Sequence, residues 1–278
     1  MANNLSDNKP LGLIAGQGDL PRLIIKKCAM QNRPIFVAAI EDQTPPETVK
    51  DIDHIWLKIG KIGSFIEAFN KHKIKEVVFA GGIKRPNFSN ISLDWEGVKL
   101  AAAISYKTLG DDAILTAITG LLESKGFRIL APADILQNIR PKAGVLTLKS
   151  PTEEEIADIN KGIRILDLLS SGDVGQAIII QMGQVLGIEA IEGTEQLIRR
   201  VRDYKLATEG GLLVKTPKIQ QNLKIDLPTI GIQTLHQLHA SQLNGVAIEA
   251  DRSQIIDQEA VIKLANELGL FIYVFNTN

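Results

Sequence analysis

The stretch LGLIAGQGDLP, residues 11–21, decides the fold of the first half of this 278-residue chain. It joins a short apolar run, through glycines, to an apolar pattern with helical spacing from Leu20 to Met30. Further apolar runs alternate with helical patterns (62–70 and 111–125): PIFVAAI (34–40), HIWLKI (54–59), EVVFAGGI (76–83) and FRILA (127–131). Apolar strands separated by helices indicate a parallel sheet covered on both faces. We therefore expect an α/β chain with an N-terminal Rossmann-like parallel-sheet domain.

The second half shows a different order of elements. Thr152 and Glu155 predict a capping box, and QAIIIQM and QVLGIEAI, joined at Met182-Gly183, indicate a hairpin. Thr194 is expected to cap a helix that runs through Tyr204. Later strands and helices alternate again, in the order LLVKT, a helix after residue 231, GVAIEA, a helix over 258–268 and FIYVF. We expect a C-terminal mixed α/β domain with a mixed sheet.

A looser segment separates the two halves. Between Pro132 and Pro151 there are few periodic apolar positions. A chain of this length with 45% hydrophobic residues is large enough for two cores. We divide it into an N-terminal domain over 1–133, a linker over 134–150 and a C-terminal domain over 151–278.

Composition excludes some classes of function. The net charge is −1, from 31 basic and 32 acidic side chains, and no basic block is interleaved with aromatics, which argues against nucleic acid as a partner. The single cysteine, Cys28, has no intramolecular disulfide partner, which fits a reducing compartment. No signal-peptide pattern opens the chain, and no apolar run approaches the ~18 residues of a membrane span. We expect a cytoplasmic protein.

Two glycine-containing loops follow strands of the first domain. Gly16 and Gly18 stand where backbone amides and a helix dipole make an anion site, but Pro21 departs from the dinucleotide fingerprint G-x-G-x-x-G. Glu41, after the second strand, keeps an NAD-binding interpretation open. AGGIKRP (80–86) ends another strand with glycines and cations, namely Gly81, Gly82 and Lys84. Asp111 opens a helix and fits a cap better than a ligand.

The octapeptide KIDLPTIG (224–231) places one carboxylate, Asp226, between apolar neighbours just before a proline. Burying such a charge is costly unless a cation, a metal or hydrogen bonds compensate it. Lys215, Lys218 and Lys224 stand upstream and suggest phosphate chemistry. A strand-end aspartate that caps a turn is the equally weighted alternative.

Other acids in the second domain are candidates for a metal site. Asp173 precedes the hairpin, and Glu189 and Glu192 follow it. Mg²⁺ takes one or two carboxylates together with substrate phosphate oxygens, so scattered acids suit it. Glu192 and Thr194 also fit a helix start.

Seven motifs in order resemble one family, the LpxI-type UDP-2,3-diacylglucosamine pyrophosphatases of lipid A biosynthesis. They span nearly the whole chain: GLIAGQGDLP (12–21), AGGIKRP (80–86), GDDAIL (110–115), SPTEEEIADI (150–159), GDVGQA (172–177), EAIEGTEQLIRRV (189–201) and KIDLPTIG (224–231). The resemblance implies hydrolysis of UDP-2,3-diacylglucosamine to 2,3-diacylglucosamine 1-phosphate (lipid X) and UMP, with Mg²⁺ or another divalent cation. It also implies that residues 1–133 form a nucleotide (UDP)-binding domain, that residues 151–278 form a catalytic, lipid-sugar-binding domain, and that the protein is a homodimer.

The family's catalytic aspartate matches Asp226. For the metal we expect Asp173, Glu189 and Asp226. For the substrate we expect contacts from ten residues: Gly16, Gly18, Leu20, Gly81, Gly82, Lys84, Asp111, Thr194, Lys215 and Gln221. One departure stands out, because Asn222 replaces a common acid and Lys224 a common arginine, while Gln221 is kept. Asparagine still offers a carbonyl oxygen to a metal.

Two alternatives to the hydrolase remain open at this stage. One is a non-catalytic module that binds a nucleotide sugar or a lipid, and the other is an NAD-dependent oxidoreductase that uses Gly16, Gly18 and Glu41. A lipid substrate also leaves room for peripheral contact with the inner membrane.

Overall fold

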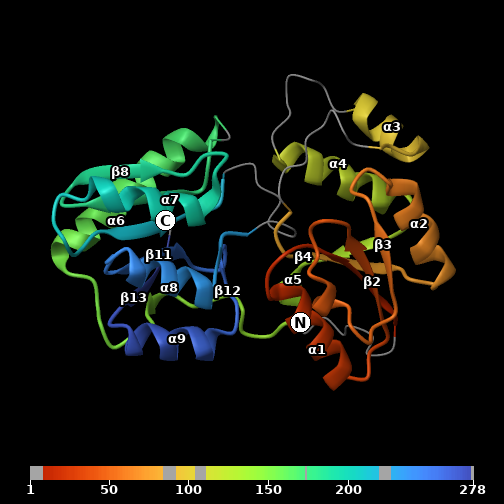
Figure 1. The fold of residues 1–278 in the computed structure, drawn as a ribbon, viewed down its shortest axis with the longest axis horizontal. Coiled ribbons are helices and arrows are strands. Elements are labelled where there is room, and N and C mark those ends of the chain that lie inside the picture. Colours follow the sequence, from red (N-terminus) through yellow and green to blue (C-terminus); the bar gives the residue numbers. More distant parts are fainter. Residues whose placement is uncertain (1–8, 84–91, 104–110, 173, 219–226, 277–278) are drawn as a thin grey trace. The chain divides into compact units, whose positions relative to one another are not determined.

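The computed structural model describes residues 9–83, 92–103, 111–172, 174–218 and 227–276. The chain forms two compact units, Met1–Gln137 and Asn138–Asn278 (Figure 1). Each unit contains its own sheet of at least five strands. Helices cover both units, so each is an α/β structure.

The sheet of unit 1 is parallel throughout. Its strand order is β3-β2-β1-β4-β5. Leu13 in the central strand pairs with Val37 on one side and Val78 on the other, and all three side chains are fully buried. The strands are β1 (Leu11–Ala15), β2 (Ile35–Ile40), β3 (His54–Leu57), β4 (Glu76–Ala80) and β5 (Arg128–Leu130). The predicted Rossmann-like sheet is confirmed.

Helices lie on both faces of this sheet (Figure 1). They are α1 (Leu20–Met30), α2 (Ile62–Lys71), α3 (Trp95–Ala103), α4 (Asp111–Ser124) and α5 (Pro132–Ile135). α1 contacts α5, whereas α2 contacts α3 and α3 contacts α4. Phe69 of α2 is fully buried and meets Phe36 and Phe127 edge to face, at ring-centroid distances of 6.3 and 6.0 Å. The sequence patterns did not predict α3.

The main sheet of unit 2 is mixed, with the order β6-β13-β11-β9-β7-β8. The three strands β9, β11 and β13 are parallel, while β7 runs antiparallel to β9 and β8, and β6 antiparallel to β13. The bounds are β6 (Gly144–Val145), β7 (Ala177–Gln181), β8 (Gln184–Ile188), β9 (Leu212–Lys215), β11 (Gly245–Glu249) and β13 (Phe271–Phe275). The predicted mixed sheet and the hairpin at Met182-Gly183 are confirmed, and both turn residues have positive φ.

Four helices pack on this sheet and produce two cores, one on each face. They are α6 (Glu153–Ser170), α7 (Gly193–Arg200), α8 (Ile232–Ala240) and α9 (Gln258–Glu267). α6 packs on one face and α7, α8 and α9 on the other. The predicted capping box of α6 is present. The Thr152 hydroxyl accepts a hydrogen bond from the Glu155 backbone N–H at 3.2 Å, and the Glu155 carboxylate accepts one from the Thr152 backbone N–H at 2.9 Å.

Several details differ from the sequence predictions. A second, two-stranded sheet pairs β10 (Thr229–Ile230) with β12 (Gln254–Ile255), and runs of two residues leave no periodic pattern to detect. The prediction that Thr194 caps a helix through Tyr204 is wrong: α7 begins at Gly193 and ends at Arg200, with a 3₁₀ turn over Val201–Tyr204. In the described part of the chain, no helix combines the length and apolarity needed to cross a membrane.

Candidate functional site

The two glycine loops of unit 1 lie at the point where the strand order reverses. β2 and β3, which follow β1 in the sequence, lie on one side of β1, whereas β4 and β5 lie on its other side. Open α/β sheets bind ligands where the order reverses in this way, at the carboxyl ends of the two central neighbours, here β1 and β4. Gly16 and Gly18 follow β1, and Gly81 and Gly82 follow β4. The loops touch, because Gln17 and Gly82 exchange backbone hydrogen bonds of 2.8 and 3.1 Å.

This close contact explains two of the four glycines sterically. A Cβ at Gly16 would stand 2.5 Å from the Gly82 carbonyl oxygen, and one at Gly81 would stand 2.4 Å from that of Gln17. Gly18 and Gly82 are different, because both are exposed and no atom lies within 4 Å of a Cβ placed there. Gly18 and Gly82 therefore leave open space beside their backbone at this crevice, although the N–H and the carbonyl of Gly82 are bonded to Gln17.

Three more expected substrate contacts belong to this unit. The Leu20 side chain is buried, which leaves only its backbone N–H, at the start of α1, to face a ligand. Asp111 is the first residue of α4. Lys84 lies outside the described residues.

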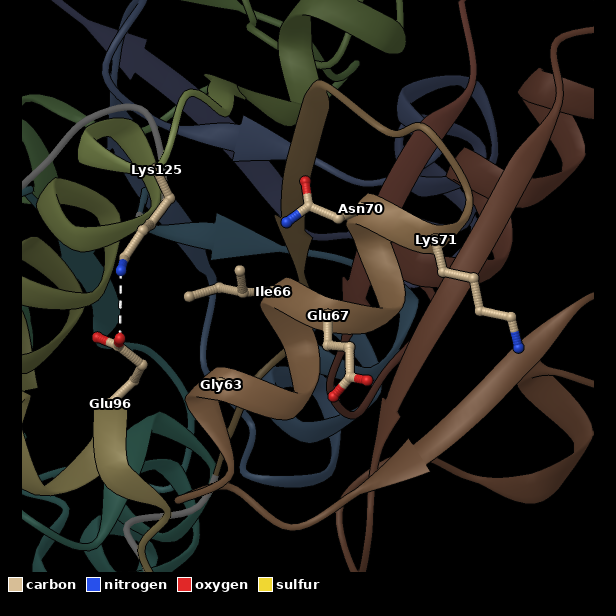
Figure 2. Close-up of a pocket in the computed structure, with 7 residues that line it drawn as sticks. All are labelled: Gly63, Ile66, Glu67, Asn70, Lys71, Glu96 and Lys125. Atoms are coloured by element: carbon tan, nitrogen blue, oxygen red, sulfur yellow. Dashed lines mark hydrogen bonds and ion pairs between the residues drawn. The ribbon is translucent and has the colours of Figure 1, made fainter.

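Unit 1 also has a hollow of about 600 Å³, and no residue of these loops lines it (Figure 2). The residues that line it are Gly63, Ile66, Glu67, Asn70 and Lys71 of α2, Glu96 of α3, and Lys125. Lys125 and Glu96 form an ion pair of 3.2 Å across it, and the hydrogen bond from Lys125 lowers the pKa of the Glu96 carboxyl. None of the expected site residues lines this hollow.

In unit 2, polar side chains gather at one edge of the mixed sheet. The strands β8, β9, β11 and β13 all end at this edge and β7 begins there. Six buried polar residues follow or end these strands: Glu189, Lys215, Thr216, Glu249, Ser253 and Gln254. Polar groups are buried at a cost, so this concentration marks the edge as a candidate site.

Glu189 follows β8 and holds its carboxylate with two donors. The Thr194 hydroxyl donates to Oε1 at 2.6 Å and the Gln176 backbone N–H to Oε2 at 3.0 Å. Thr194 therefore supports Glu189 instead of capping α7. Gly175 permits this arrangement, since a Cβ there would clash with the Glu189 carbonyl at 2.0 Å.

Glu192 stands beside this group at the start of α7. Burial alone would raise the pKa of its carboxyl, but hydrogen bonds from its own backbone N–H and from Arg200, together with the charge of Arg200, hold the pKa below its ordinary value. The Arg200 to Glu192 distance is 2.9 Å. Glu192 is thus committed to an ion pair at the surface of α7.

Lys215 ends β9, and Ala177 of β7 lies between it and Glu189. Ala177 pairs with Lys215 in register and accepts the Glu189 backbone N–H at 2.8 Å. Glu189 contacts α7, and Lys215 donates to the Thr229 carbonyl, at 3.2 Å, in the strand that leads into α8. The two residues thus share one face of the sheet, their backbones two strand spacings or about 10 Å apart, with Ala177 between them on the intervening strand.

Three other expected site residues, Asp173, Gln221 and Asp226, lie outside the described residues. Of the three expected metal ligands, Glu189 is therefore the one described. Its carboxylate chemistry suits Mg²⁺, and each oxygen accepts one hydrogen bond and so retains a second lone pair. Within the described part of the chain, no three His, Cys, Asp or Glu side chains come together as a metal site.

Sequence reasoning missed two charged residues at this edge. Glu249 ends β11, its side chain is 3% exposed, and its Oε1 accepts from Arg252 at 3.0 Å. The available signal was a carboxylate at the end of the apolar strand GVAIEA, where ligands bind in open sheets.

Comparison with known proteins decides the family. The LpxI N-terminal domain family matches residues 10–139 and the LpxI C-terminal domain family residues 142–273. The chain belongs to the LpxI family. One LpxI relative, from Caulobacter vibrioides, is named UDP-2,3-diacylglucosamine pyrophosphatase and is 35% identical over 271 residues, which cover 95% of this chain and 96% of the relative.

Two solved structures resemble this LpxI chain distantly. The precorrin-6A reductase CobK has a TM-score of 0.35 and 10% identity, over 97% of this chain and 88% of that one. A leucoanthocyanidin reductase from Vitis vinifera, solved with NADPH, has a TM-score of 0.29 and 10% identity, over 96% and 78% of the two chains. Likeness at this level carries no argument about function.

Membership of the LpxI family corrects the functional statement drawn from the sequence. That statement named the reaction products and kept two other classes of function beside the hydrolase. The family matches and the Caulobacter relative support a pyrophosphatase of the LpxI type, and neither a separate binding module nor an oxidoreductase is retained. The relative's name specifies no products, so it does not support the assignment of lipid X and UMP as the products.

Proposed function

We propose that this chain is a pyrophosphatase that acts on UDP-2,3-diacylglucosamine. The observation that carries the proposal is 35% identity, over nearly the full length of both chains, to a relative of that name. Both LpxI domains match, so the likeness is not confined to one unit.

The crevice of unit 1 suits the nucleotide part of such a substrate. Gly18, with φ of +87°, and Gly82 expose backbone at the carboxyl ends of β1 and β4. The N-terminal turn of α1 begins directly after this loop, and the Asp19 side chain makes no capping hydrogen bond to it. Free N–H groups at a helix start and glycine backbone together favour an anion such as a phosphate.

The sheet edge of unit 2 suits the hydrolytic step. The ammonium group of Lys215 is buried. In surroundings of low dielectric constant, such a positive charge stabilises the negative charge on a departing phosphate more strongly than it would in water. We assign to Asp226 the role of activating the attacking water or orienting a metal, as the resemblance implies. Glu189, oriented by Thr194 and Gln176, would hold Mg²⁺ together with Asp173 and Asp226. When bound, Mg²⁺ supplies charge neutralisation on the diphosphate oxygens.

Substrate selection tests the proposal. We would measure hydrolysis of UDP-2,3-diacylglucosamine by mass spectrometry, beside UDP-N-acetylglucosamine, which carries the same diphosphate without the two long acyl chains. We expect turnover of the diacylated substrate and a much lower kcat/KM for the other. Equal rates with both would contradict the proposed substrate, and no hydrolysis of either would contradict the activity.

A further inference from the structure

The loop that follows β11, residues 250–253, places an arginine at the carboxyl edge of the unit 2 sheet. β11 lies between β9 and β13, so the loop leaves the interior of the sheet and not its margin. Arg252 pairs with the buried carboxylate of Glu249 at 3.0 Å, while its own side chain remains 38% exposed. One N–H of the guanidinium thus meets Glu249, and the outer part of the group reaches solvent.

Backbone contacts fix this loop at both ends. The Glu249 N–H donates to the Ser253 hydroxyl at 3.2 Å, and the Ala250 N–H to the Phe275 carbonyl at 2.8 Å. Asp251 adopts a left-handed conformation with φ of +57°, which aspartate tolerates better than most residues. An arginine on so constrained a loop is oriented before any ligand arrives.

The same loop lies beside the segment that continues from Asp226. Gln254, two residues after Arg252, pairs with Thr229 and donates its N–H to the Pro228 carbonyl at 2.8 Å. Lys215 donates to the carbonyl of Thr229 at 3.2 Å. The segment after Arg252 and the end of β9 therefore both contact the start of β10, three residues after the expected catalytic aspartate.

We propose that Arg252 contacts the diphosphate of the substrate and that Glu249 is the residue that positions it. This inference rests on the proposed pyrophosphatase function. A guanidinium has five N–H donors in a planar fork that matches two phosphate oxygens, and pairing with Glu249 leaves donors for that purpose. Glu249 restrains the side chain, so less rotamer freedom is lost when the phosphate binds.

A purely structural role is the competing explanation. Removing one partner of a buried ion pair leaves an uncompensated charge, and that alone is destabilising. The sheet of unit 1 offers a comparable arginine, Arg128, which is 58% exposed and meets the buried Glu76 at 3.2 Å. Glu76 also pairs with Arg33 at 2.6 Å, so it keeps a partner in R128A. Arg128 and Glu76 are the first residues of β5 and β4, so they lie at the amino ends of the strands, away from the crevice.

The experiment compares R252A, E249Q, the double variant E249Q/R252A and the control R128A in the full-length protein. For each we would measure kcat and KM on UDP-2,3-diacylglucosamine and the urea midpoint of unfolding. The double variant removes both charges of the ion pair, so the loss of charge balance that R252A causes at Glu249 is absent. It carries the test even if R252A alone fails to fold.

We expect R252A to lower kcat/KM by ~10²-fold, because losing one hydrogen-bond donor to the charge that develops in the transition state has an effect of that size. We expect E249Q/R252A to have a kcat/KM as low as that of R252A. E249Q keeps the arginine and loses less than R252A does, while R128A retains wild-type kinetics. Recovery of wild-type kinetics in E249Q/R252A would overturn the proposal, because Arg252 would then serve only to neutralise Glu249. Unchanged kinetics in R252A would overturn it as well. Wild-type protein without turnover would instead reject the function on which the proposal rests.

Discussion

Glu189 is the residue of the unit 2 edge whose surroundings are most fully determined. Its two oxygens accept from a hydroxyl and a backbone N–H, and both bonds are strengthened by the negative charge. In E189Q the amide oxygen can still accept from the Gln176 N–H, but the Thr194 hydroxyl must accept from the new NH₂ group, and both hydrogen bonds lose the assistance of the charge. We expect the free energy of unfolding to fall by about 1–3 kcal/mol. Urea denaturation measures this loss.

The matched control is E195Q, at an exposed position in the first turn of α7. We expect that variant to unfold within about 0.5 kcal/mol of wild type. An E189Q variant as stable as E195Q would show that the two hydrogen bonds contribute nothing measurable.

Asp226 carries the sharpest kinetic prediction at the residue scale. Replacing it with alanine removes the carboxylate assigned to water activation or to the metal, and we expect kcat to fall by about 10²–10⁴-fold. Substrate binding, measured by calorimetry, should persist. Turnover near the wild-type rate would remove Asp226 from the chemistry.

Local patterns in the sequence mark some candidate residues. Asp226 is marked because a charged residue interrupts an apolar run before a proline, and Lys215 because it belongs to the basic series upstream of Asp226. Glu249 and Arg252 were not found, because their significance depends on β11 lying between β9 and β13, and strand order is not written in local sequence. Thr194 was assigned to a cap, although its hydroxyl turns to Glu189.

At the scale of elements, the contact between the loops after β1 and β4 makes a stability prediction. Gly81 has φ of +90° and no room for a Cβ, whereas Gly82, its neighbour, has open space. We expect G81A to lose at least about 1–3 kcal/mol of unfolding free energy from backbone strain, with the clash against Gln17 in addition.

Its neighbour supplies the control for that measurement. G82A should remain within about 0.5 kcal/mol of wild type by urea denaturation, because the site is exposed and unstrained. Equal midpoints for the two variants would mean that the loops do not pack as closely as their hydrogen bonds indicate.

Helices and strands were predictable where the apolar residues of the sequence form a recognisable pattern. The alternation of apolar strands with helical patterns predicted the parallel sheet of unit 1, and the capping box at Thr152 predicted the start of α6. The short strands β6, β10 and β12 escaped, since two residues carry no periodicity and their pairing is set by tertiary contacts. α3 was not predicted either, because its short sequence WEGVKLAAA ends in three successive alanines and shows no clear apolar face.

At the scale of the whole molecule, the division into two units accompanies two separately matched family domains. The resemblance implies a homodimer, which stays a prediction. Light scattering at micromolar concentration should give twice the 30.4 kDa of one chain. A mass of one chain across the concentration range would contradict it.

Pyrophosphatase activity itself is tested most directly by ³¹P NMR of the full-length protein with UDP-2,3-diacylglucosamine and Mg²⁺, followed over time beside a sample with excess chelator. Hydrolysis of the diphosphate predicts that its signals disappear and that two phosphomonoester signals grow, in the metal-containing sample only. A diphosphate spectrum that stays unchanged, from protein shown to be folded by circular dichroism, would contradict the activity proposed for this chain.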